Sequence, residues 1–363
     1  MRTLENMTIK NFKSIREQTL PLKLLNVFIG GNGVGKSNLI EVFRFLRETV
    51  NQNLEGYTAL KGGADTLLYF GRKRSSEMEF YLEFGEGSIS NAYDVKIRGT
   101  DDDSLMILSE TAYYHEKDRH KKPYDRSVSL SSRESKLKYV DHICGRQVMK
   151  DLDGYRVYHF HDTSDTSGVK RTGEVEDNRF LRSQAENLAA FLYWLQEKKP
   201  DHFENIQDAV RQVAPFFESF MLAPSKLNES KIRLEWKEKG SDAYFNASSL
   251  SDGTLRFICL ATLLLQPELP AIILLDEPEL GLHPAAIALL ADLLSSAATQ
   301  TQIMVSTQSV TLVNQFQPEQ VWAVDREDGQ SVFRHLSSAD MSAWLDDYAL
   351  GDLWEKNVLG ARP

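Results

Sequence analysis

The chain has 363 residues, of which 42% are hydrophobic and 26% charged, a composition typical of one elaborated globular domain or two smaller ones. No apolar run reaches the ~18 residues of a membrane-spanning helix, and the N-terminus lacks the layout of a signal peptide, so we expect a cytoplasmic protein without a membrane partner. Two cysteines exclude a disulfide framework and a thiolate zinc site. The net charge of -10 argues against a surface that coats nucleic acid indiscriminately.

The N-terminal region predicts a strand, a glycine loop and a helix in direct succession. Residues 24–29 form an apolar run typical of a buried strand, and glycines follow at once. From Ser37 onward, apolar side chains recur at helical spacing. This order is the setting that a phosphate-binding loop requires.

Residues 30–37 fit the phosphate-loop pattern G-x-x-x-x-G-K-[ST]. Glycines leave room for phosphate oxygens next to backbone N–H groups, and the N-terminus of the helix adds a positive dipole end. Lys36 is expected to reach the β and γ phosphates, and the Ser37 hydroxyl to bind Mg²⁺, so the predicted cofactors are ATP and Mg²⁺. The nucleotide-binding residues predicted here are Gly30, Asn32, Gly33, Gly35, Lys36, Ser37 and Asn38.

The middle of the chain predicts an inserted lobe. Short strands are expected within 77–138, a mobile loop over 164–178, and helices over 180–197 and 202–220. We therefore expect a discontinuous core, residues 1–110 and 225–363, interrupted by a lobe over 111–224.

Residues 271–278 form an apolar strand that ends in two carboxylates. The strand places Asp276 at the carboxyl edge of a parallel sheet, where it is expected to hold Mg²⁺. Glu277 points differently and is predicted to accept a proton from the water that attacks the γ-phosphate.

The sequence LSDGT at 250–254 precedes a predicted helix. Together with the phosphate loop, the NFKS run at 11–14 and DEPELGLHP at 276–284, it resembles an ABC-type ATPase head of the SMC/RecF/OLD-like group. The ending at 351–363 resembles a bacterial family of predicted ATP-binding AAA-type ATPases with phage-defence-like members. The resemblance implies an α/β P-loop fold with an antiparallel β lobe and a helical lobe, and no heptad pattern predicts a long coiled coil.

The resemblance also implies a homodimer in which two copies sandwich ATP. Ser251 and Gly253 of one copy would contact the γ-phosphate held by the other, and residues 279–284 would link the two sites. His283 is either a contact across these sites or part of a helix cap.

Two positions depart from the group's pattern. Gln308 stands where these ATPases carry a histidine that senses the γ-phosphate; it can orient water but cannot carry charge, so we expect slow or stimulated hydrolysis. No glutamine falls where the group's Q-loop belongs, and residues 62–66 are either its replacement or a plain turn.

Two further patterns each have a functional and a structural interpretation. His159 and His161 share one strand face, which fits a metal site, a satisfied polar edge or a hydrogen bond that ties the middle lobe to the nucleotide site. Residues 115–138 are basic with interleaved tyrosines, which fits either DNA binding or a solvated loop.

The chain after Gln308 is too short for the Toprim nuclease of OLD-like proteins, so a nuclease or other effector is expected to be a separately encoded partner. The predicted function is an ATP-hydrolysing switch in bacterial genome maintenance or anti-phage defence. The alternative is an ATP-gated sensor or scaffold with little turnover that recruits the nuclease. A transporter subunit and a P-loop kinase fit less well, because of the long interval between Lys36 and Ser251 and because of the LSDGT element.

Overall fold

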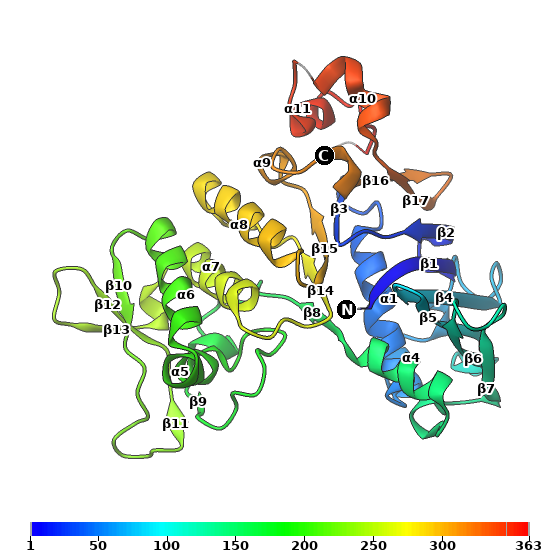
Figure 1. Cartoon of the computed structure of the whole chain (residues 1–363), viewed down its shortest axis with the longest axis horizontal. Helices are drawn as coiled ribbons and strands as arrows, with labels where there is room; N and C mark the ends of the chain where they lie inside the picture. The colour runs from blue at the N-terminus through cyan, green and yellow to red at the C-terminus, as the bar shows by residue number, and fades with distance from the viewer. Residues whose placement is uncertain (1, 346, 362–363) are drawn as a thin grey trace.

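The computed structural model describes residues 2–345 and 347–361, and its elements surround two six-stranded sheets (Figure 1). The sheet at the centre of the molecule has the strand order β17-β16-β3-β15-β14-β8, in which all neighbours are parallel except β16 and β17. Its strands are β3 (Leu25–Ile29), β8 (Tyr155–Tyr158), β14 (Ile272–Asp276), β15 (Gln302–Thr307), β16 (Val321–Glu327) and β17 (Gln330–His335). This is the α/β fold expected from the sequence, with the added hairpin strand β17.

The parallel sheet is buried on both faces. In β3, every residue is buried; Val27 and Ile29 join one hydrophobic core, while Phe28 joins the other. Parallel sheets are covered on both faces in this way because the crossover helices lie over them. The helix α1 (Lys36–Val50) covers one face, and α7 (Asp252–Leu265) and α8 (Pro284–Ala297) cover the other.

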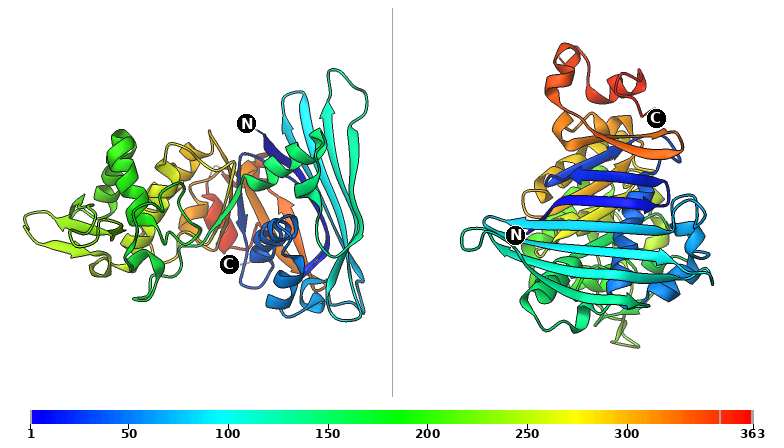
Figure 2. Two further views of the ribbon diagram at one scale, coloured as in Figure 1. Left: turned by 90° about the horizontal axis from the view of Figure 1, so that it is seen from below. Right: turned by 90° about the vertical axis from the view of Figure 1, so that its right-hand side faces the viewer.

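The second sheet is antiparallel and packs against the far side of α1 (Figure 2). Its order is β2-β1-β4-β5-β6-β7, with β1 (Thr3–Phe12), β2 (Ile15–Pro21), β4 (Glu77–Glu86), β5 (Ile89–Gly99), β6 (Leu105–Glu116) and β7 (Tyr124–Ser132). The short helices α2 (Leu54–Leu60), α3 (Ala64–Leu67) and α4 (Ile143–Asp153) accompany this sheet.

The predicted domain boundary at residue 110 needs correction, because it falls inside β6. Residues 111–132 continue the antiparallel sheet through β7, and β8 forms the edge of the parallel sheet. Residues 115–138, for which the sequence left DNA binding and a solvated loop open, lie in the hairpin formed by the end of β6, an exposed turn and β7, and in the segment that follows it.

A helical lobe begins after β8. It contains α5 (Leu188–Lys198), α6 (Pro200–Val213) and a small sheet of β10 (Phe217–Phe220), β12 (Glu235–Glu238) and β13 (Tyr244–Asn246). The two helices are shorter than predicted. Asn187 closes the turn before α5 through bonds to the carbonyls of Asp177 and Phe180, and Pro215 disfavours a helical conformation at Ala214, where α6 ends.

The segment predicted as a mobile loop, 164–178, has regular structure. It holds the 3-10 turn η2 (Gly168–Lys170) and the strand β9 (Gly173–Glu174), which pairs with β11 (Lys231–Ile232). The polar composition of the segment gave no sign of this pairing, because the two strands lie far apart in the sequence.

The chain ends in α9 (Val310–Val313), α10 (Ser338–Leu345) and α11 (Leu350–Glu355). Of the terminal motif that carried a family resemblance, Arg362 and Pro363 lie outside the described residues. None of the helices formed by residues 2–345 and 347–361 combines the length and the apolar character that crossing a bilayer requires.

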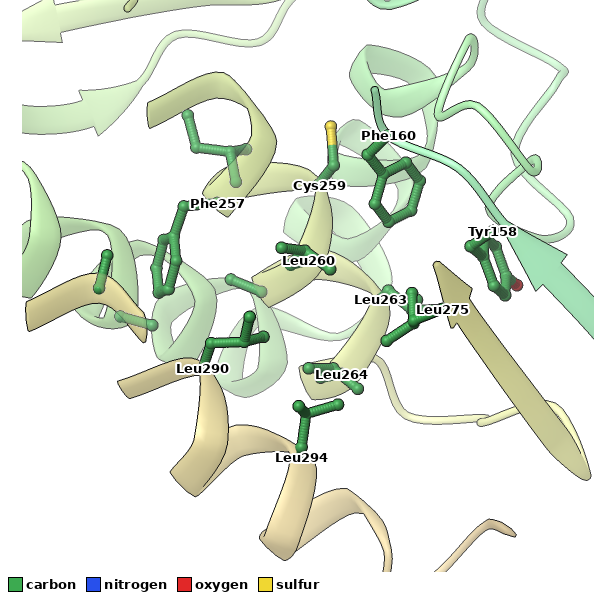
Figure 3. Close-up of a cluster of buried hydrophobic side chains, with 14 of the residues drawn as sticks. Tyr158, Phe160, Phe257, Cys259, Leu260, Leu263, Leu264, Leu275, Leu290 and Leu294 are labelled. Carbon is green, nitrogen blue, oxygen red and sulfur yellow. The ribbon is translucent and has the colours of Figure 1, made fainter. Parts of the chain in front are cut away.

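Figure 3 shows how α7 is fixed against the parallel sheet. Leu263 on α7 lies beside Leu275 on β14, while Leu264 on the same helix points toward Leu294 on α8, next to Leu290. All five side chains are buried, and burial of a leucine contributes about 1.5–3 kcal/mol. The helix α7, which begins at Asp252 within LSDGT, is therefore packed tightly against the strand that ends in Asp276.

Candidate functional site

Three adjacent parallel strands bring the predicted residues together. In β3 and β15, Ile29 pairs with Thr307, and in β14 and β15, Asp276 pairs with Ser306. The segments that follow these strands are the phosphate loop, Glu277 and Gln308. Ligands bind at this carboxyl edge in open α/β sheets.

The glycines of the phosphate loop shape a cradle for an anion. A Cβ on Gly30 would lie 2.3 Å from the carbonyl oxygen of Val324, and one on Gly35 would lie 2.0 Å from Ser331 Oγ. Gly33, with φ +78°, has no heavy atom within 4 Å of that position. Close packing on one side and open space on the other fit the approach of a triphosphate to the backbone.

Lys36 is only 5% exposed, and its ammonium group donates hydrogen bonds to the carbonyls of Gly30 and Gly31. Burial lowers the pKa of Lys36, while Glu277 and Asp276 oppose this shift through their charge. The ammonium group therefore lies inside the loop.

Ser37 and Asp276, which the sequence predicts as magnesium ligands, lie next to each other. Ser37 Oγ lies 3.5 Å from Asp276 Oδ1, and Ser306 Oγ donates to the same carboxylate oxygen. One hydroxyl and one carboxylate fit Mg²⁺, which keeps several waters and takes further oxygens from phosphates. The donor set thus suits a Mg²⁺–ATP complex.

Glu277 has a left-handed backbone conformation, with φ 44°, that is uncommon for a residue other than glycine. Its N–H donates to the carbonyl of Ser306 over 2.9 Å, which fixes the turn. The side-chain amide of Gln308 donates to the Glu277 carboxylate and, over 2.8 Å, to Asn32 Oδ1. Unusual backbone geometry of this kind clusters at functional sites.

Glu279 also belongs to the candidate site, although the sequence did not predict a role for its side chain there. It is 7% exposed, and its carboxylate accepts hydrogen bonds from Thr307 Oγ1 and from the Gln308 N–H, the latter over 3.1 Å. Burial raises the pKa of Glu279. This carboxylate holds the backbone of Gln308 in place, and its position within an acidic motif gave no sign of that role.

His161 hydrogen-bonds through Nε2 to the backbone carbonyl of Asp276 over 2.7 Å, because β8 and β14 are neighbours. The hydrogen-bond interpretation therefore holds for His161. His159 Nε2 is buried without a hydrogen-bond partner, and burial lowers its pKa to about 4. Within residues 2–345 and 347–361, no three His, Cys, Asp or Glu side chains are grouped so that they could hold a metal ion.

Ser251 caps α7 by accepting a hydrogen bond from the Thr254 N–H over 3.2 Å. A Cβ on Gly253 would lie 2.4 Å from the carbonyl oxygen of Gly281, so this helix start packs closely against the 279–284 loop. Ser251 and Gly253 lie at the start of α7, whereas the phosphate loop follows β3. His283 caps α8, which is one of its two predicted roles.

Arg256 on α7 is a second residue near the candidate site whose role the sequence did not predict. Its guanidinium donates to three carbonyl oxygens: Phe160, over 2.9 Å; His161, over 3.1 Å; and Leu280. It therefore joins the LSDGT helix to the end of β8 and to the 279–284 loop.

Asn38 and residues 62–66 lie beside the phosphate loop. The Asn38 amide donates to Ser14 Oγ over 2.7 Å. Asp65 and Thr66 line, with Ser14, Gly33 and Asn38, an open groove of about 700 Å³. The replacement of the Q-loop by residues 62–66 stays a prediction.

The fold is similar to that of solved SMC heads. A crystal structure of an Smc head bound to the C-winged helix domain of ScpA has 16% sequence identity and a TM-score of 0.62, and the match covers 93% of this chain and 99% of that chain. The Smc head with an extended coiled coil bound to the C-terminal domain of ScpA, from Pyrococcus furiosus, has 17% identity and a TM-score of 0.58, with 96% and 99% covered. At these identities the likeness establishes the fold, an α/β P-loop ATPase head, and confirms that prediction.

The chain matches no curated protein sequence. The family described as "AAA domain, putative AbiEii toxin, Type IV TA system" matches residues 25–314, which contain the phosphate loop, LSDGT, Asp276 and Gln308. The resemblance to ABC-type ATPases of the SMC/RecF/OLD-like group is thereby confirmed, and the fold is one that binds and hydrolyses nucleotide. Since this match covers most of the chain, the protein belongs to that AAA domain family.

Proposed function

We propose that this protein is a Mg²⁺-dependent ATPase that acts as a homodimeric switch. The observation that carries the proposal is the convergence of Ser37, Asp276, Glu277 and Gln308 at the ends of three neighbouring strands. These residues supply a metal-binding pair, a carboxylate for proton transfer and an amide to orient water, beside a loop that accepts phosphates.

Each residue has a distinct role in the proposed hydrolysis. Lys36 binds the β and γ phosphates, and Ser37 and Asp276 hold Mg²⁺, which neutralises charge that develops on the phosphates. Glu277 accepts the proton of the attacking water, and Gln308 orients that water and the carboxylate. The groove lined by Phe70 and Arg326 lies on the outer side of the loop and offers room for the nucleoside.

Phosphate release from Mg²⁺–ATP tests this activity. Lys36→Ala should abolish release, because the phosphates lose their buried cation. Lys23→Ala, at an exposed position before β3, is the matched control and should not change it. Equal release by the wild type and by Lys36→Ala would refute the proposal.

The homodimer places Ser251 and Gly253 over the γ-phosphate of the second copy. Support comes from the exposure of Ser251 at the start of α7, where backbone N–H groups and the helix dipole favour an anion. Gly253 lets the 279–284 loop pack directly against the start of this helix, which positions the loop next to Ser251.

The dimer is proposed to act on a partner, a separately encoded nuclease or other effector, in genome maintenance or anti-phage defence. SMC heads crystallised with domains of ScpA show that this fold can carry a partner on its surface. DNA is a second proposed partner, at the exposed basic hairpin between β6 and β7. Purification from native cells tests the first, and the salt dependence of DNA binding tests the second.

A sensor or scaffold with little turnover is the alternative. It is favoured by Gln308, whose neutral amide donates to Glu277 and leaves the base with a competing hydrogen bond. Phosphate release with and without DNA separates the two, because a scaffold stays slow in both cases.

A further inference from the structure

Lys170 lies close to the start of the LSDGT helix. Its side chain as a whole is only 7% exposed, so most of its aliphatic part is packed against protein. Its Nζ lies 3.9 Å from Asp252 Oδ1 and 3.6 Å from Asp165 Oδ1, and these carboxylates are 69% and 93% exposed. The lysine is thus held in place while both acidic neighbours extend into solvent.

The position of Lys170 is set by packing. It ends the turn η2, in which Val169 is 4% exposed, and Ser167, which precedes the turn, is 2% exposed. The turn η2 contacts the turn η3 (Ala247–Ser249) that leads into LSDGT. Ser167 Oγ is buried and has no hydrogen-bond partner among the described residues. A side chain on such a support is preorganised rather than free to search for partners.

Neither acidic contact satisfies the ammonium group. Both separations exceed the ~2.7–3.2 Å range of a direct hydrogen bond. Lys170 therefore retains donors for an acceptor that approaches the exposed start of α7.

The negative charge of Asp252 explains why a cation is useful at this position. It is the first residue of α7, between Ser251 and Gly253, and its charge favours the helix N-terminus of the isolated chain. The same charge would repel the γ-phosphate that the proposed dimer brings to this surface. Lys170 is the ammonium group that lies next to this carboxylate and offsets it.

We propose that Lys170 binds the γ-phosphate of the ATP held by a second copy of the chain and offsets the repulsion from Asp252. The inference rests on the proposed homodimer and extends its site to the 164–178 segment. In the closed dimer, the ammonium group exchanges its long contacts with acidic side chains for a direct bond to a phosphate oxygen.

The test measures the Mg²⁺–ATP concentration at which half of the protein is dimeric, by sedimentation, in the Glu277→Gln background. Lys170→Met should raise this concentration by about tenfold or more, as expected for one lost charge-assisted bond, while Lys170→Arg should stay within about threefold. Lys231→Met is the matched control, because Lys231 pairs with Glu174 on the same lobe, and it should have no effect.

Asp252→Asn provides an independent arm. This substitution should lower the half-point, the Mg²⁺–ATP concentration at which half of the protein is dimeric, because the repulsive charge is removed. In the Lys170→Met background it should reverse part of the rise in that concentration. Binding of a fluorescent ATP analogue to the monomeric variants should be unchanged, which shows that the phosphate loop is intact.

An unchanged half-point for Lys170→Met, or an equal rise for Lys231→Met, would overturn the inference. If Lys170→Met fails to fold, an unchanged half-point for Asp252→Asn overturns it instead. A Glu277→Gln protein that stays monomeric refutes the homodimer itself, which is a distinguishable result.

Discussion

The side-chain amide of Gln308 donates to the carboxylate of Glu277 and also to Asn32 Oδ1 over 2.8 Å. The residue that follows β15 therefore joins the proposed general base to the phosphate loop. The neutral Gln308 side chain thus connects the residue that follows β14 with the loop that follows β3.

Replacing Gln308 with alanine should lower kcat for ATP hydrolysis by about 10- to 100-fold and leave KM nearly unchanged, because the amide orients the base and water rather than the bound phosphates. Steady-state phosphate release measures both constants. Gln315→Ala, at an exposed site outside the loop, is the control. A loss confined to KM would show that Gln308 serves binding alone.

Glu279 should act through Gln308. Glu279→Ala removes the acceptor of two hydrogen bonds and should lower kcat to a similar degree, with a loss of about 1–3 kcal/mol in the free energy of unfolding. Glu279→Gln keeps an acceptor oxygen and should retain most activity. Kinetics and chemical unfolding of both variants check this. Equal kcat losses in the two variants would contradict the interpretation that Glu279 acts only as a hydrogen-bond acceptor for Thr307 and Gln308.

His159 predicts a loss of stability in acid. Burial lowers its pKa from 6.5 to about 4, so between these values the unfolded chain binds a proton that the folded chain does not. The neutral His159 therefore contributes to the free energy of unfolding above pH 6.5, and this contribution is lost as the pH falls toward 4. The loss is up to about 2 kcal/mol after allowance for solvent screening.

The measurement is urea unfolding at pH 7.5 and at pH 5 for the wild type and His159→Gln. Glutamine is polar but does not titrate, so the variant should lose less stability between the two values than the wild type. The exposed His120→Gln should behave as the wild type does. Parallel losses in all three proteins would show that other groups cause the acid sensitivity.

Arg256 should contribute strongly to stability. Arg256→Met leaves the carbonyls of Phe160, His161 and Leu280 without a donor and should cost roughly 2–4 kcal/mol of unfolding free energy. Arg233→Met removes an exposed pair with Glu235 and should cost less than about 1 kcal/mol. Similar costs for both would contradict the proposed connection between α7 and the 279–284 loop.

Local patterns predicted where the glycine loop and Asp276 lie in the fold. The phosphate loop lies between a buried strand and a helix, and Asp276 follows a run of apolar residues, so each motif fixed its own position in the sheet. Adjacent parallel strands then brought Ser37, Asp276 and Gln308 together.

The residues missed from the sequence act through tertiary contacts. Arg256 donates to backbone carbonyls, which exist at every position and carry no sequence signal. The strand β9 pairs with β11 across a long interval, and Lys170 reaches Asp252 from that same segment. The boundary at residue 110 was wrong for a similar reason, because pairing in the antiparallel sheet, not local composition, decides where β6 ends.

The mass of the Glu277→Gln protein in solution tests the central claim, that two copies enclose ATP between the phosphate loop and LSDGT. With saturating Mg²⁺–ATP, light scattering should give twice the mass of one chain, and without nucleotide the mass of one chain. Adding Ser251→Arg should abolish the dimer while ATP still binds the monomer. A protein that remains monomeric at saturating ATP would contradict the account.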